Sequence, residues 1–153
     1  MPPDTTDEEV ALLECNLDDM TGEALAYALE RLLEEGALDA WFTPIVMKKG
    51  RPAVILSVLC RPDDAPALRQ AMLRETTTLG VRWRLTEREV AERTTDSLDT
   101  PWGPVRRKLK HLAGRVVSVK PEYEDCARLA REHNVPLQDV IDRARELPAD
   151  PIA

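Results

Sequence analysis

The spacing of apolar residues predicts most of the elements in the first part of the chain. The run VALLE at residues 10–14 indicates a buried strand, and the leucines after Thr21 fall on one helical face until Gly36 ends the helix. Residues 39–47 (DAWFTPIVM) and 53–60 (AVILSVLC) are aromatic and β-branched, which favours two strands. We therefore expect the order strand, helix, strand, strand, with Pro44 placing its strand at a sheet edge.

A second helix and a fourth strand follow. Asp63 or Asp64 can cap a helix whose apolar residues recur at helical spacing up to Glu75. Residues 81–86 (VRWRLT) alternate strictly between apolar and polar, which predicts a strand with one solvated face. The order βαββαβ is that of the ferredoxin-like split βαβ fold. Residues 10–95 are thus expected to form an α+β ferredoxin-like core with an antiparallel sheet.

Residues 96–147 predict an extension of the same domain. A hairpin is expected to turn near residues 101–104, and residues 115–120 (RVVSVK) indicate one more strand. Two helices that open at Pro121 and Pro136 then form a helical hairpin.

Composition limits the class of protein. With 153 residues, 43% of them hydrophobic and 32% charged, the chain fits one domain. No apolar run is long enough to cross a bilayer and the start lacks a signal-peptide pattern, so we expect a cytoplasmic protein. Residues 1–9 and the tail at 148–153 have little to bury and are expected to fray. The three cysteines lack CxxC spacing and predict packed thiols, and two isolated histidines do not support a nickel or zinc site.

The charge is divided unevenly along the chain. The net charge is -7, but residues 1–47 hold 12 acidic residues against Arg31 alone, which leaves 16 acidic and 20 basic residues in the rest. Overall acidity argues against non-specific nucleic-acid binding, whereas the basic remainder leaves room for an anionic ligand such as a phosphate chain. The alternative is mutual neutralisation of the two parts across the fold or a subunit contact.

One candidate for anion binding is the loop KKGRP at residues 48–52. Lys48 and Lys49 supply point charges, Arg51 supplies a planar fork, and glycine allows close backbone approach, which together suit a phosphate chain. Charged hairpin loops are more often simply solvated.

A second candidate is the cluster RETTTLGVR. Thr76, Thr77 and Thr78 offer hydroxyls, and Arg82 lies on the solvated face of the strand that follows. Helix termination with Gly80 in a left-handed turn also explains the threonines and the glycine, although it leaves the gathering of arginines unexplained.

Acidic residues near two expected helix starts are the candidates for cation binding. Asp18 and Asp19 follow the first strand and could hold a hard divalent cation that also touches phosphates. Both also complement the helix dipole, as do the acids after Lys120 in VKPEYEDC. No nucleophile elbow, phosphate loop or dinucleotide fingerprint is present, so no catalytic residue is assigned.

Four motifs, NLDDMTGE, GALDAWFTPIVMKKGRP, LRETTTLGVR and KPEYEDCARLA, resemble the C-terminal domain of the LarC nickel-insertion family. The resemblance extends from about residue 13 to about residue 145. It implies a CTP-dependent cyclometallase, a nickel chelatase of the lyase class. Such an enzyme loads nickel into pyridinium-3,5-bisthiocarboxylic acid mononucleotide, forming metal-sulfur and metal-carbon bonds while CTP is hydrolysed to CMP and pyrophosphate, and so completes the nickel-pincer cofactor.

The resemblance also implies how this domain works. The C-terminal domain in that family binds CTP with manganese or magnesium and assembles into homo-trimers or hexamers. The family's N-terminal domain, with its histidine-rich and nickel-binding parts, is not part of this sequence, so we expect an excised domain or a split-gene product. The residue roles that it implies are as follows: Lys48, Lys49, Arg51 and Arg82 at the triphosphate; Thr76, Thr77 and Thr78 at phosphate or ribose; Asp18, Asp19 or Glu75 at the divalent ion; and Lys120 and Glu122 as further candidates.

Two other classes of function remain open from the sequence. One is a regulatory ferredoxin-like domain that senses a small anion without turnover. The other is a structural oligomerisation domain whose acidic and basic parts pair between subunits. RNA binding is disfavoured by the acidity and by the scarcity of aromatic residues.

Overall fold

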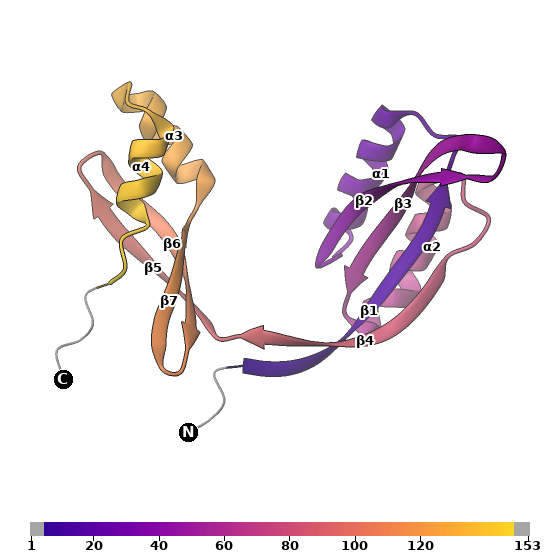
Figure 1. The fold of residues 1–153 in the computed structure, drawn as a ribbon, viewed down its shortest axis with the longest axis horizontal. Coiled ribbons are helices and arrows are strands. Elements are labelled where there is room, and N and C mark those ends of the chain that lie inside the picture. Colours follow the sequence, from indigo (N-terminus) through magenta and orange to yellow (C-terminus); the bar gives the residue numbers. More distant parts are fainter. Residues whose placement is uncertain (1–4, 149–153) are drawn as a thin grey trace. The chain divides into compact units, whose positions relative to one another are not determined.

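The computed structural model describes residues 5–148 (Figure 1). The elements in this range are β1 (Thr5–Leu17), α1 (Gly22–Glu34), β2 (Asp39–Met47), β3 (Arg51–Cys60), α2 (Ala65–Glu75), β4 (Arg82–Ala91), β5 (Arg93–Thr100), β6 (Gly103–Leu112), β7 (Arg115–Pro121), α3 (Tyr123–His133) and α4 (Leu137–Ala144), with short 3-10 turns at Lys48–Gly50 and Pro62–Asp64. Contacts divide the described chain into two compact units. The first unit is residues 7–88, and the second is residues 89–148 with Thr5 and Thr6.

The first unit contains a four-stranded sheet in the order β2-β3-β1-β4. β3 pairs antiparallel with both β1 and β2, and α1 and α2 share one hydrophobic core with the sheet. This order and direction confirm the expected ferredoxin-like arrangement. β2 lies at the edge, as Pro44 predicted, because an edge strand can leave the missing N–H unpaired.

Alternation along β1 and β3 decides which side chains enter this core. Leu13 and Cys15 in β1, and Leu56 and Val58 in β3, are buried and belong to the core cluster. The intervening side chains, including Glu14, point to the sheet face that the helices do not cover. Burial of each large aliphatic side chain contributes roughly 1.5–3 kcal/mol, so this alternation sets the register of the sheet.

The second unit contains a three-stranded antiparallel sheet in the order β5-β6-β7, packed against α3 and α4. Thr100 pairs with Gly103, so the hairpin turns at Pro101 and Trp102, as expected. The further strand and the helical hairpin are also confirmed. Pro121 does not open α3, however: it is the last residue of β7, and the helix begins at Tyr123.

Two arginines tie the helices of the second unit to its sheet. Arg107 is 2% exposed and donates to Asp96 at 2.8 and 2.5 Å and to the carbonyl of Ala144 at 3.2 Å. Arg106 donates to Asp125 from its side chain at 2.8 and 3.0 Å and from its backbone N–H at 3.0 Å. These bonds lower the pKa of the Asp125 carboxyl from 3.8 to about 2.

Several expectations are corrected. β1 begins at Thr5, so residues 5–9 form strand rather than a frayed end, because that part of β1 pairs within a sheet. Gly80 does not adopt the left-handed conformation expected for a helix terminator.

Trp83 and Leu85 are 49% and 46% exposed, so β4 does not bury one face as its alternation predicted. The reason is that β4 is the other edge strand. Residues 1–4 and most of the expected tail, residues 149–153, lie outside the described range.

The boundary between the parts also differs from the expected one. The sequence placed the core at residues 10–95 and the extension at 96–147, whereas the contacts divide the chain between Arg88 and Glu89, within β4.

Candidate functional site

The pairing of strands brings several predicted site residues to one end of the four-stranded sheet. Leu17, the last residue of β1, pairs with Val54 near the start of β3. Met47 pairs with Arg51, so the turn Lys48–Gly50 closes the β2-β3 hairpin at the same end. The loop after β1 and the KKGRP hairpin therefore lie beside each other, although about thirty residues separate them in the sequence.

Two polar contacts join three segments at this end. Arg51 Nη1 lies 3.2 Å from Asp18 Oδ2, and the Thr77 hydroxyl donates to Asp19 Oδ1 at 2.5 Å. The Asp18 side chain is 19% exposed, whereas that of Arg51 is 54% exposed. Two carboxylates, a guanidinium group and a hydroxyl thus meet where β1 ends, β3 begins and α2 ends.

The three threonine hydroxyls have different hydrogen-bond partners. The Thr76 hydroxyl donates to the Met72 carbonyl at 2.7 Å and accepts from the Thr78 backbone N–H at 3.3 Å. The Thr78 hydroxyl donates to the Gly80 carbonyl at 2.8 Å. Thr76 and Thr78 therefore shape the turn after α2, and Thr77 is the threonine whose hydroxyl reaches a predicted site residue.

Cys15 lies under this turn and was not singled out in the sequence. Its side chain is buried, and burial raises the pKa of the thiol, while Thr78, Thr76 and the charge of Arg82 act in the opposite direction. A lone cysteine inside an apolar strand carries no sequence signal of such a neighbourhood. The structure places it beside the threonines of the cluster.

The two lysines of the hairpin are exposed and make no ion pair within the described chain. Lys49 has φ 63° and ψ 20°, a left-handed conformation that is uncommon for residues other than glycine. It is followed by Gly50 with φ 71°. The hairpin thus presents two unneutralised charges on a strained turn.

Arg82 lies on the open face of the sheet, as predicted, but it has a carboxylate partner there. Arg82 Nε and Arg84 Nη1 approach the same Glu14 oxygen at 3.4 and 3.3 Å. Glu14 also accepts from the Ser57 hydroxyl at 3.3 Å. Two arginines share one carboxylate, which leaves this spot with a positive charge.

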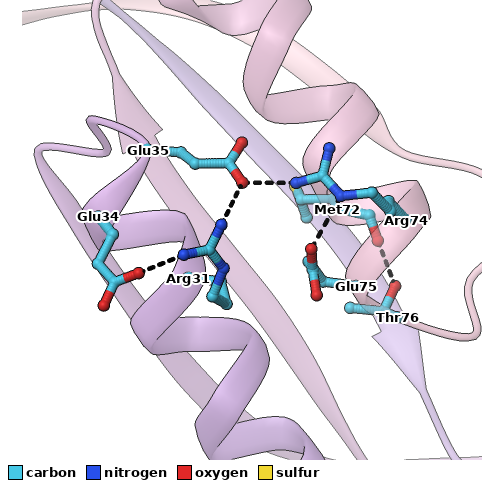
Figure 2. Close-up of polar contacts among 7 residues, drawn as sticks. All are labelled: Arg31, Glu34, Glu35, Met72, Arg74, Glu75 and Thr76. Carbon is cyan, nitrogen blue, oxygen red and sulfur yellow. Dashed lines mark hydrogen bonds and ion pairs between the residues drawn. The ribbon is translucent and has the colours of Figure 1, made fainter.

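Glu75 forms an ion pair with Arg74 and does not contact the predicted aspartates (Figure 2). Arg74 Nε lies 2.8 Å from Glu75, and Arg74 Nη2 lies 2.5 Å from Glu35, which also contacts Arg31 at 3.4 Å. Arg31 in turn pairs with Glu34 at 2.5 Å. The Glu75 carboxylate therefore takes part in a network between the two helices, and its contacts do not include the aspartates after β1.

Lys120 and Glu122 belong to the second unit, whereas the other ten predicted residues belong to the first. Glu122 lies 2.6 Å from Lys108 Nζ, and this lysine lowers the pKa of the Glu122 carboxyl. Lys120 lies opposite Lys108 across the β6-β7 pair.

The donor set after β1 suits only a particular kind of cation. Among residues 5–148, no group of three or more His, Cys, Asp and Glu side chains could hold a metal ion by itself. Asp18 and Asp19 supply hard oxygen ligands, and Mg²⁺ or Mn²⁺ is commonly held by one or two carboxylates together with phosphate oxygens. These residues therefore fit a divalent ion that arrives with a phosphate chain.

The model of the family described as nickel insertion protein matches residues 2–141. This chain belongs to the nickel insertion protein family. The pyridinium-3,5-bisthiocarboxylic acid mononucleotide nickel insertion protein of Geobacillus kaustophilus is 45% identical over 140 residues, which are 92% of this chain and 34% of that protein. The chain therefore spans about a third of the length of its curated relatives.

Solved structures agree with this membership. The apo C-terminal domain of a cyclometallase involved in the synthesis of the NPN cofactor of lactate racemase is 42% identical, with a TM-score of 0.86, over 91% of this chain and 96% of that one. A Methanopyrus kandleri protein is 25% identical with a TM-score of 0.68, over 94% of this chain. The resemblance to the C-terminal domain of the LarC nickel insertion family is thus confirmed. No helix in the described range is long and apolar enough to span a membrane.

Proposed function

We propose that this chain is the CTP-binding and divalent-metal-binding C-terminal domain of a CTP-dependent nickel insertase. The whole protein would load nickel into pyridinium-3,5-bisthiocarboxylic acid mononucleotide and complete the nickel-pincer cofactor. The observation that carries the proposal is the meeting of Asp18 with Arg51 and of Asp19 with Thr77 at one end of the sheet. Family membership supplies the context for this site.

Each group has a chemical task in this proposal. Arg51 and the lysines of the hairpin bind the triphosphate, the arginine as a bidentate fork. Because the Arg51 side chain is 54% exposed, solvent screens its contact with Asp18, which contributes about 1 kcal/mol or less and can open when a phosphate arrives. Asp18 is then free to ligate the divalent ion, which would offset phosphate charge. Thr77 holds Asp19 in place until that exchange.

Substitution of Arg51 tests the triphosphate contact. We expect Arg51→Ala to raise the dissociation constant of CTP about tenfold or more, because a charge-assisted bidentate contact is lost. The constant for CMP should change less, since CMP lacks the terminal phosphates. Both constants can be measured by calorimetric titration in the presence of Mn²⁺.

Arg61→Ala is the matched control, because Arg61 is an exposed arginine of the same unit that also pairs with a nearby aspartate, Asp64. This variant should bind CTP normally. Equal losses of CTP and CMP affinity in Arg51→Ala would refute the placement of the triphosphate at the hairpin.

We also propose that the chain assembles as a homo-trimer or hexamer. By alternation, Leu12, Ile55 and Leu59 point to the sheet face that α1 and α2 do not cover, and all three are partly buried in the isolated chain. These three side chains form an apolar patch on a face that also carries Glu14 and Ser57, and such mixed faces can serve as subunit interfaces. Light scattering should give three or six times the chain mass of 17.2 kDa. A monomer at physiological salt would contradict this assembly.

A further inference from the structure

The sheet of the second unit presents several basic side chains on its outer face. Residues 93–120 contain seven basic and two acidic residues. Arg93 lies opposite Lys110, and Lys110 lies opposite Ser118. Lys108 lies opposite Lys120, and cross-strand partners project from the same face of a sheet. Because Lys108 and Lys110 are two residues apart, all these side chains share one face, and Leu109 between them is buried.

These side chains surround a cavity. Arg93, Lys108, Lys110, Ser118 and Lys120 line a hollow of about 480 Å³, whose wall also includes Val90. The lining belongs entirely to the second unit. Four cationic groups and a hydroxyl therefore converge on one space large enough for a small ligand.

Three of the four cationic groups in this cavity have no anionic partner in the described chain. Lys108 pairs with Glu122 at 2.6 Å, but Arg93, Lys110 and Lys120 have no ion pair or side-chain hydrogen bond within residues 5–148. Like charges directly opposite each other in a sheet are destabilising, and this face has two such pairs.

The two neighbouring arginines of β6, in contrast, each have a carboxylate partner. Arg106 and Arg107, which hold the helices, are matched by Asp125 and Asp96 respectively. The unit thus pairs the arginines that hold its helices, whereas three of the four cations of the cavity, Arg93, Lys110 and Lys120, have no anionic partner among residues 5–148.

We propose that this cavity binds a phosphate-bearing small anion, either a polyphosphate chain or the phosphate group of a mononucleotide. Arg93 offers a planar fork, Lys110 and Lys120 offer point charges, and Ser118 offers a hydroxyl donor. The site goes beyond the nucleotide site proposed at the β2-β3 hairpin, since it lies in the other unit and shares with the predicted residues only Lys120. It stands whether or not CTP binds at the hairpin.

Titration of the full chain with sodium tripolyphosphate and with ribose 5-phosphate tests this site. In amide NMR spectra, both ligands should shift the signals of residues 108–110 and 118–120. The double variant Lys110→Gln with Lys120→Gln should bind at least tenfold more weakly. Its unfolding temperature should equal or exceed that of the parent, because cross-strand repulsion is removed, so loss of binding is separated from misfolding. Tighter binding of tripolyphosphate indicates a polyphosphate ligand, and equal binding indicates a single phosphate ester.

Two control variants keep the outcome specific. Arg115→Gln removes one charge from an exposed position of the same sheet that does not line the cavity, and it should weaken binding less than twofold. Arg51→Ala, at the hairpin of the first unit, should leave the NMR shifts of residues 108–120 unchanged. The proposal is overturned if neither phosphate compound binds, if Arg115→Gln weakens binding as much as the double variant, or if only a single-stranded oligonucleotide binds, with an affinity that grows with its length.

Discussion

At the scale of single residues, the side chains predicted to share one site at the end of β1 have different contacts in the structure. Thr76 and Thr78 serve the turn, and Glu75 serves the network between the helices, while Thr77 contacts Asp19. Shaping of the turn after α2 therefore explains two of the three hydroxyls, and a binding role stays a prediction for Thr77.

A prediction at this scale concerns Asp125. Its pKa is lowered to about 2 by Arg106, so its ionised form stabilises the folded state above the usual carboxyl pKa near 4, and this stability is lost as the pH falls from about 4 toward 2. Asp125→Asn should lower the free energy of unfolding at pH 7 by about 2 kcal/mol, since bonds to a charged acceptor are lost. Urea denaturation at pH 7 and pH 3 measures both effects. If the variant weakens toward acid as steeply as the parent, Asp125 is not the titrating group.

At the scale of elements, patterns that depend on nearby residues were the predictable ones. The apolar runs of β1 and β3 and the leucine spacing of α1 gave the order of elements, because burial on one face imposes a period on the sequence. The alternation of β4 wrongly predicted a buried face. Trp83 lies on an edge strand, where the Arg69 Cζ atom lies 4.6 Å from the centre of its ring. An exposed tryptophan under a cation has the same sequence pattern as a buried one.

Contacts between distant elements were not predictable. Asp18 and Arg51 are 33 residues apart, and Asp19 and Thr77 are 58 apart. The basic cavity of the second unit could not be predicted either, because Lys108 and Lys120 become neighbours only through the register of β6 and β7. Strand register is set by the whole sheet and is not visible in any short motif.

A prediction at the scale of elements concerns the β2-β3 hairpin. Lys49 has a left-handed backbone, which costs a residue with a Cβ atom roughly 1–2 kcal/mol relative to glycine. Lys49→Gly should therefore be more stable than Lys49→Ala by about 1 kcal/mol in urea denaturation. Both variants should lose the same CTP affinity, because both lose the charge. A more stable alanine variant would show that the turn is not strained at this position.

At the scale of the whole molecule, the two proposed sites differ in charge. The end of the four-stranded sheet combines carboxylates with cations, which suits a metal bound together with a phosphate chain. The cavity of the second unit is cationic alone and suits a bare anion. The chain spans about a third of its curated relatives, so nickel transfer itself is a property to be sought in the longer proteins.

The most direct measurement is calorimetric titration of the chain with CTP, with ATP, GTP and UTP in parallel, each with and without Mn²⁺. We predict saturable binding that requires the metal and favours CTP by at least tenfold over the other three nucleotides. Absence of CTP binding, or equal binding of all four nucleotides without metal dependence, would contradict the proposed function. It would leave a regulatory or structural role for this domain in the nickel insertion family.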